Sequence, residues 1–220
     1  MRYRAVFFSI AVLALAWVAQ GQATQPTTEP IEPTTPKGAL KSLALALDAG
    51  DRERIRSLMY AASPAEQKMV DATSEFAASI ADLKHTMARR FGESASLIAM
   101  GESSDALPNR LAAIDSAEQK VNGDLAVINL SAAMPRDSMS LVRAGGYWKI
   151  SISQQLKDEG LTPQQVDEKM ATVSSQSKIL KDLTAEVTAG KYLTAADVAS
   201  ALRGKMSGSH EPTPAAPAAP

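Results

Sequence analysis

The stretch IDSAEQKVNGDLAVINL, residues 114–130, decides the fold class that the sequence predicts. The pair Asn122-Gly123 stands between two runs of strand-like composition, Ile114 to Val121 and Leu125 to Leu130. Asn-Gly in this position is the strongest short signal for a β-hairpin. The sequence therefore predicts two paired antiparallel strands here.

A second hairpin is predicted further along the chain. Met139 to Val142 and Tyr147 to Ile152 flank the turn Ala144-Gly145-Gly146. In the later run apolar and polar residues alternate, which gives a strand one dry face and one wet face. Two successive hairpins build a four-stranded antiparallel meander, and its dry face needs a helical cover.

Helical patterns precede the meander. A first helix ends at Gly50, and Asp51 caps a second, short helix, so that the two form a helical hairpin. Ser63-Pro64-Ala65-Glu66 then has the capping-box pattern, in which serine and glutamate satisfy backbone amides reciprocally. Apolar residues recur in steps of three and four from Met69 to Phe91, so we expect this long helix to cover the meander.

Helical patterns return after the meander. Thr162-Pro163-Gln164-Gln165 begins a helix whose apolar stripe runs from Val166 to Val187, and Thr194 with Asp197 caps a last helix. These helices could dock on the domain, stand apart as an antiparallel coiled-coil pair, or present their stripe to a second copy of the chain. The sequence leaves these three arrangements open.

Met1 to Ala23 has the pattern of an export signal. Arg2 and Arg4 precede the apolar run Ala5 to Ala19, and Gly21-Gln22-Ala23 offers small residues for cleavage. An uncleaved anchor is the alternative, but about 15 apolar residues fall short of the roughly 20 that a membrane helix needs. We therefore expect a periplasmic or extracellular protein without a stable membrane anchor. The chain has no cysteine, which excludes a lipoprotein anchor and disulfides.

Composition divides the remaining chain into four parts. We predict a Pro/Thr-rich linker (24–36), an α+β domain (37–155), a C-terminal helical segment (160–206) and a disordered Ala/Pro tail (207–220). Loss of the signal leaves 21 basic and 24 acidic residues, a net charge of about −3. No basic stripe interleaved with aromatic residues is present, so nucleic acid is excluded as a partner.

Two short motifs resemble those of the nuclear-transport-factor-2-like superfamily. They are Ala46-Leu47-Asp48-Ala49-Gly50-Asp51, where a helix ends in a glycine-aspartate break, and the closing strand Gly145-Gly146-Tyr147-Trp148-Lys149-Ile150. The resemblance covers residues 38–153 and implies a cone, in which helices pack into the concave side of a curved antiparallel sheet around a pocket. The linker and tail are similar to those of exported bacterial proteins.

Enzymes of that superfamily, such as the ketosteroid isomerase and polyketide cyclase types, hold an acid-base carboxylate and polar partners inside the cone. The residues of this chain that could line such a pocket are Tyr60, Asp82, Asp115, Asn129 and Trp148. Nothing in their spacing requires them to converge, and the alternating pattern favours Trp148 as a core residue. Asp82 lies beside the apolar stripe, where charges normally face water.

No reactive motif stands out elsewhere in the sequence. His85 is the only histidine between residues 37 and 206, and it lacks the spacing of a metal ligand. Ser175 and Lys178 have the Ser-x-x-Lys spacing of penicillin-binding enzymes without the companion motifs. We therefore assign no catalytic, cofactor-binding or metal-ligating residue and expect no cofactor.

The sequence thus predicts an exported, non-catalytic α+β protein that binds a small apolar ligand or a protein partner. Two alternatives stay open. One is a helical interaction or assembly module, which would use the stripe from Val166 to Val187 and could form a homo-oligomer. The other is an isomerase or cyclase-type enzyme of the nuclear-transport-factor-2-like fold.

Overall fold

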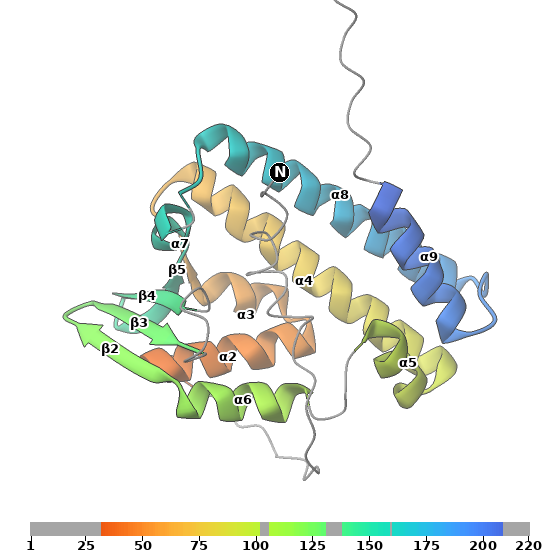
Figure 1. The fold of residues 1–220 in the computed structure, drawn as a ribbon, viewed down its shortest axis with the longest axis horizontal. Helices are drawn as coiled ribbons and strands as arrows, with labels where there is room; N and C mark the ends of the chain where they lie inside the picture. Colours follow the sequence, from red (N-terminus) through yellow and green to blue (C-terminus); the bar gives the residue numbers. More distant parts are fainter. Residues whose placement is uncertain (1–31, 102–105, 131–137, 159, 209–220) are drawn as a thin grey trace, which may run out of the picture.

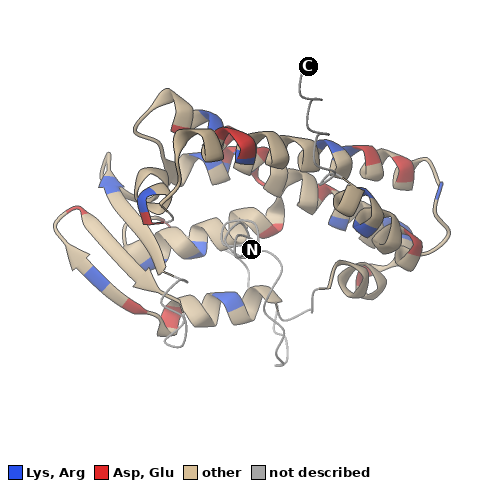
Figure 2. Cartoon of the chain, turned by 45° about the horizontal axis from the view of Figure 1, so that its top comes forward, with Lys and Arg blue, Asp and Glu red and all other residues tan. Residues whose placement is uncertain are grey.

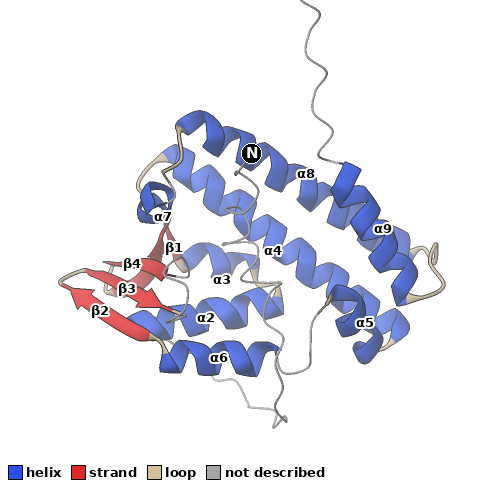
Figure 3. Cartoon of the chain, in the orientation of Figure 1, coloured by secondary structure: helices blue, strands red, loops and turns tan. Residues whose placement is uncertain are grey.

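The computed structural model describes residues 32–101, 106–130, 138–158 and 160–208, which form a mixed α+β fold (Figure 1). The strands gather at one end and helices make up the rest (Figure 3). The predicted export signal, residues 24–31 of the predicted linker and residues 209–220 of the predicted tail lie outside the described residues. In chain order the elements are α2 (Pro36–Ala49), α3 (Arg52–Ser57), β1 (Met59–Tyr60), α4 (Pro64–Phe91), α5 (Glu93–Met100), α6 (Ala106–Ser116), β2 (Glu118–Asn122), β3 (Leu125–Asn129), β4 (Ser138–Ala144), β5 (Tyr147–Ser151), α7 (Ile152–Asp158), α8 (Pro163–Thr188) and α9 (Ala195–Gly208).

The helices at the start of the fold confirm the sequence signals, with one adjustment. Asp51 caps α3 by accepting a hydrogen bond from the backbone N–H of Arg54 at 2.9 Å. Ser63 caps α4 through the N–H of Glu66 at 3.2 Å. The Glu66 carboxylate, however, accepts from the N–H of Ala62 at 2.6 Å rather than from the capping serine. Ordered structure also starts inside the predicted linker, since Thr35 caps α2.

The sheet has five strands in the order β1-β5-β4-β3-β2, so the predicted four-stranded meander is incomplete. β2 to β5 pair antiparallel in sequence order, as expected. The additional strand, β1, pairs parallel with β5 and places Met59 beside Ile150. A two-residue strand directly after a helix has no room for the alternation that reveals longer strands.

The predicted strand from Ile114 to Val121 was wrong at its beginning. Ile114 is the last buried apolar residue of α6, where it follows Leu107 and Leu111 at helical spacing and packs against α2. β2 starts only at Glu118, and the turn at Gly123 lies where the hairpin signal put it. Ile152 likewise begins α7 instead of ending β5.

Two apolar cores divide the molecule, and this corrects the expected cover of the sheet. The inner face of the sheet packs mainly on α2, and α4 adds the buried Met69 and Val70 and the partly buried Ala77 to that core. The rest of the α4 stripe packs with α5, α8 and α9 in a second core. The fully or largely buried members of this second core are Phe76, Leu83, Met87, Met100, Leu180, Leu183, Val187, Ala195 and Val198.

The C-terminal helices dock on the domain, which decides between the three arrangements that the sequence left open. α8 lies along α4, and α9 packs against α5 and α8 (Figure 1). Thr162 and Gln165 form the predicted capping box, and Thr194 and Asp197 satisfy each other's backbone amides at 3.2 and 3.0 Å. The α8 stripe is therefore buried within this chain.

Two glycines with positive φ give a matched test of the contact between α2 and α4. At Gly50 (φ 68°) an added Cβ would lie 2.7 Å from the Cβ of Ala81, whereas at Gly123 (φ 60°) it would meet nothing within 4 Å. We expect Gly123→Ala to lower the free energy of unfolding by about 1–2 kcal/mol, the cost of the left-handed conformation. Gly50→Ala should lose about 1–3 kcal/mol more, because the side chain also overpacks the interface. Urea denaturation measures both, and equal losses would contradict the close approach.

Candidate functional site

The structure does not bring the five predicted pocket residues together. Tyr60 lies in β1 and Trp148 is buried in β5 as part of the first core, as the alternating pattern favoured. Asn129 is half-buried at the end of β3. Asp82 and Asp115 are both exposed, on α4 and α6. No site in which these groups converge is formed.

Asp115 serves as a tie between helices. Its carboxylate forms an ion pair with Lys41 of α2, and its backbone carbonyl accepts a hydrogen bond from the Nζ of Lys37 at 2.7 Å. His85 is exposed on α4. Lys178, from the Ser-x-x-Lys match, is exposed and pairs with Asp182 at 2.6 Å. These groups hold helices or face solvent.

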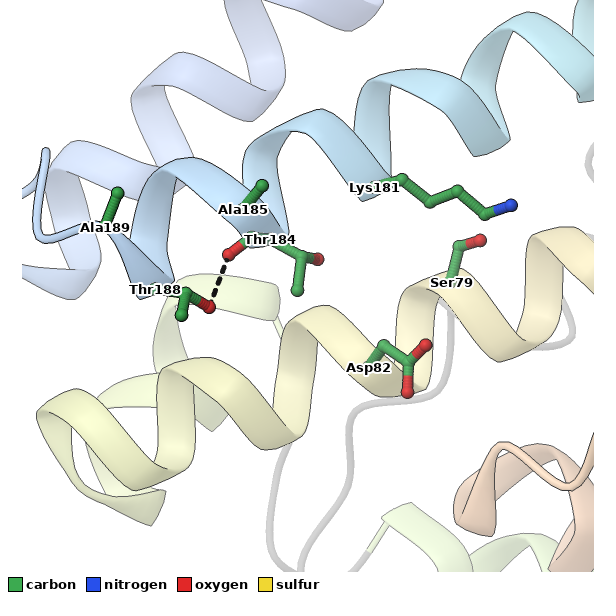
Figure 4. A pocket seen from close by; sticks show the side chains of 7 residues that line it. All are labelled: Ser79, Asp82, Lys181, Thr184, Ala185, Thr188 and Ala189. Carbon is green, nitrogen blue, oxygen red and sulfur yellow. Dashed lines mark hydrogen bonds between the residues drawn. The ribbon is translucent and has the colours of Figure 1, made fainter.

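An open groove of about 460 Å³ lies between α4 and α8 (Figure 4). A second hollow of about 220 Å³ shares Lys181 with it and continues between the same helices. Small and polar side chains form the walls of the larger groove. Its lining residues are Ser79, Asp82, Lys181, Thr184, Ala185, Thr188 and Ala189.

The polar groups of this groove are largely engaged already. Ser79, Thr184 and Thr188 each donate their hydroxyl hydrogen to a carbonyl one turn earlier in their own helix, at 2.8–2.9 Å. Lys181 is bound to Glu75, and Asp82 stands exposed at the wall. What the groove offers a ligand is an open surface lined by small side chains, with no enclosed chamber.

Glu75 connects three helices at the rim of the smaller hollow. It pairs with Arg52 of α3 at 2.6 Å and with Lys181 of α8, while its own backbone belongs to α4. The hydrogen bond from Lys181 is the main cause that holds the pKa of the Glu75 carboxyl below its ordinary value of 4.5. This charge cluster fixes α8 against α4 and explains why Lys181 is not available to a ligand.

The outer face of the sheet is a second exposed feature. We use this name for the face that carries Leu125, Val127, Val142 and Tyr147. Val142 is half-buried there and pairs with the half-buried Lys149. Leu125 is 58% exposed and Tyr147 46%. Cross-strand pairing places Leu125 beside Val142. A row of apolar side chains open to water is typical of a protein-binding surface.

β2 borders this face and is the last strand of the sheet. All five of its residues are exposed, and in the described part of the chain nothing pairs with its outer edge. Glu118 and Lys120 lie on one face of the strand and form an ion pair at 3.3 Å. Figure 2 shows charged residues of both signs along the sheet edge. An edge strand of this kind presents backbone N–H and C=O groups to a further strand.

Comparison with known proteins adds no assignment: no family model, no curated protein and no solved structure matches the chain. Among the residues that the structure describes, no group of three or more histidine, aspartate or glutamate side chains could hold a metal ion. None of the helices within the described ranges is long and apolar enough to cross a membrane.

Glu186 holds α9 against the end of α8. Its carboxylate accepts hydrogen bonds from Lys191 at 2.7 Å, from the hydroxyl of Tyr192 at 2.6 Å and from Lys205 at 2.9 Å. These donors, Lys191 foremost, lower the pKa of Glu186 from 4.5 to about 2. Burial, and then the bond to Glu186, raise the pKa of Tyr192 from 10.0 to about 12.

This cluster predicts two pH limbs in the stability of the protein. A lowered carboxyl pKa stabilises the fold above pH 4.5, and this contribution is lost as the pH falls toward 2. A raised tyrosine pKa stabilises the fold below pH 10.0, and this contribution is lost as the pH rises toward 12. The measurement is the urea concentration at the unfolding midpoint, plotted against pH. We expect Glu186→Gln to reduce its fall at both acid and alkaline pH, and Tyr192→Phe to reduce chiefly the alkaline fall.

The matched control is Asp82→Asn, which removes an exposed carboxylate that has no hydrogen-bond or ion-pair partner among the described residues. It should leave both limbs as they are in the unaltered chain. If the urea midpoint of Glu186→Gln falls with acid as steeply as that of the control, this carboxylate does not anchor α9.

Proposed function

We propose that the protein is an exported, non-catalytic binding protein that receives an extended segment of a protein partner at the outer edge of β2. The observation that carries this proposal is that all five residues of β2 are exposed at the end of the sheet, next to the outer face. Export rests on the signal pattern of residues 1–23.

Strand addition suits this edge for a physical reason. A partner strand would form main-chain hydrogen bonds to β2, which supply affinity, while alternate side chains would supply specificity. Leu125 and Val127 lie one strand inward and add apolar contact for side chains that reach across the edge. The charges of Glu118 and Lys120 would discourage strands that do not match them.

A small apolar ligand, the other half of our sequence-based hypothesis, has less support. The inner face of the sheet, where the cone of the nuclear-transport-factor-2-like superfamily would hold its pocket, is occupied by core side chains such as Ile128, Leu141 and Ile150. The groove between α4 and α8 lies outside that face and is an open surface groove, not an enclosed chamber. A relationship to that superfamily stays part of the proposal, as the sequence motifs suggested it.

The two alternative functions also lose support. An isomerase or cyclase needs an inward-facing base, and both candidate carboxylates, Asp82 and Asp115, are exposed. A helical assembly module needs a free stripe, and Leu180, Leu183 and Val187 of α8 are buried against α4 and α9. Four of the six large hydrophobic side chains that are exposed in the described residues, Val121, Leu125, Val127 and Tyr147, lie on the sheet.

Photo-crosslinking in the native host tests the proposed function. A photoreactive phenylalanine derivative at Val121, which is 50% exposed on β2, should yield a defined protein adduct because the partner strand would lie against it. The control carries the same group at Ile98 of α5, which is 79% exposed and far from the sheet (Figure 1). Position-specific adducts at Val121 support the proposal, and equal or stronger labelling at Ile98 overturns it.

A further inference from the structure

Resting on the proposed function, we infer that the strand received by β2 is the β2 of a second copy of this chain. The two strands run antiparallel around a twofold axis through Gln119, so that Glu118 of each copy faces Lys120 of the other. The two sheets then form one continuous sheet. The inference depends on three steps: a symmetry rule, the order of charges along β2, and the side chains beside the axis.

Symmetry first limits the possible registers. A twofold axis perpendicular to the sheet makes the two edge strands antiparallel and keeps each side chain on its own face. Directly opposed residues in an antiparallel pair must point to the same face, and neighbouring residues of one strand point to opposite faces. The central pair must therefore consist of one residue of β2 and its own copy, with the axis midway between them. We name each register by this central residue.

The charges of the residues that would face each other then distinguish the possible registers. An axis through Glu118 sets two carboxylates against each other, and an axis through Lys120 sets two ammonium groups against each other. An axis through Val121 opposes Glu118 to Asp124 of the second copy, again twice. Like charges that lie directly opposite destabilise a strand pair.

The axis through Gln119 has the opposite property. It pairs Glu118 with the second copy's Lys120 and repeats the pair by symmetry, with two uncharged amide side chains at the centre. An axis through Asn122 would move the contact onto the turn at residues 123 and 124, beyond the strand. The order Glu-Gln-Lys is thus self-complementary in one register within β2.

The exposed side chains beside the axis fit the same arrangement. Glu118 and Lys120 pair with Asn129 and Val127 of β3, so they lie on the outer face, where the two copies would form a ring of four alternating charges. Val121 lies on the other face and comes opposite Ala117 of the second copy, whose small side chain is buried in its own core. The contact is short, so we expect a weak, reversible dimer that salt weakens further.

Charge reversal tests this register in solution. In sedimentation equilibrium, Glu118→Lys and Lys120→Glu should each weaken dimerisation about tenfold or more, because two attractive pairs become repulsive. The double variant Glu118→Lys with Lys120→Glu should restore it. A mixture of the two single variants should form heterodimers, although neither retains the ion pair within its own β2 strand. Both side chains are exposed, and circular dichroism checks that the variants fold.

Cysteine substitution gives a second, independent readout, because the natural chain has no cysteine. Gln119→Cys should oxidise to a disulfide-linked dimer faster than Val121→Cys, since only residue 119 meets its own copy. Faster linkage of Val121→Cys overturns the register. A chain that stays monomeric up to its solubility limit, with no disulfide linkage in the Gln119→Cys variant, overturns the inference.

The outcomes separate this inference from the proposed function. If the chain stays monomeric while Val121 labels a protein of different mass, a foreign strand occupies β2 and only the self-association fails. If Val121 gives no adduct of any mass, the binding function of β2 fails as well. An adduct of twice the chain mass, lost in Lys120→Glu, supports both.

Discussion

The position of α4 between two apolar cores is the constraint on which the rest of the structure depends. Its first turns supply Met69 and Val70 to the core under the sheet, and its later turns supply Phe76, Leu83 and Met87 to the core with α8. One rigid helix therefore fixes the sheet end and the helical end relative to each other. Gly50 marks the closest approach, where α2 packs so near Ala81 that no Cβ fits without a shift.

This arrangement leaves the outer face of the sheet open around Leu125 and Tyr147, whereas Ser140 on the same face is buried and hydrogen-bonds to Asp158 of α7. α2 takes the inner face, and α4 turns most of its stripe toward α8, so Leu125 and Tyr147 stay exposed on the outer face. The chain also ends its sheet with β2, which no described element covers. The helices α4, α5, α8 and α9 pack with one another in the second core and do not cover the β2 edge. Uncovered strand edges are where further strands pair.

The sequence could predict the elements whose ends are marked by local chemistry. Ser63 and Thr162 begin helices through side-chain hydrogen bonds, and Asn122-Gly123 makes a turn within a few residues. It could not predict β1, whose pairing with β5 is non-local, nor that Ile114 packs on α2. The exposed edge of β2 was not predicted as a site, because the resemblance placed the expected pocket on the inner face of the sheet. Glu-Gln-Lys-Val-Asn, with one apolar residue in five, was the available signal of an exposed edge strand.

The carboxyl groups with shifted pKa values hold helices together. Catalytic carboxylates are usually desolvated, with their pKa raised, whereas the shifted carboxyls here, Glu75 and Glu186, have their pKa lowered by ammonium groups that join helices. Their charges stabilise the packing of α8 and α9. In the described part of the chain, the outer edge of β2 presents backbone N–H and C=O groups that pair with no other strand. Side-chain charge therefore joins the helices, whereas the edge strand β2 stays exposed to solvent.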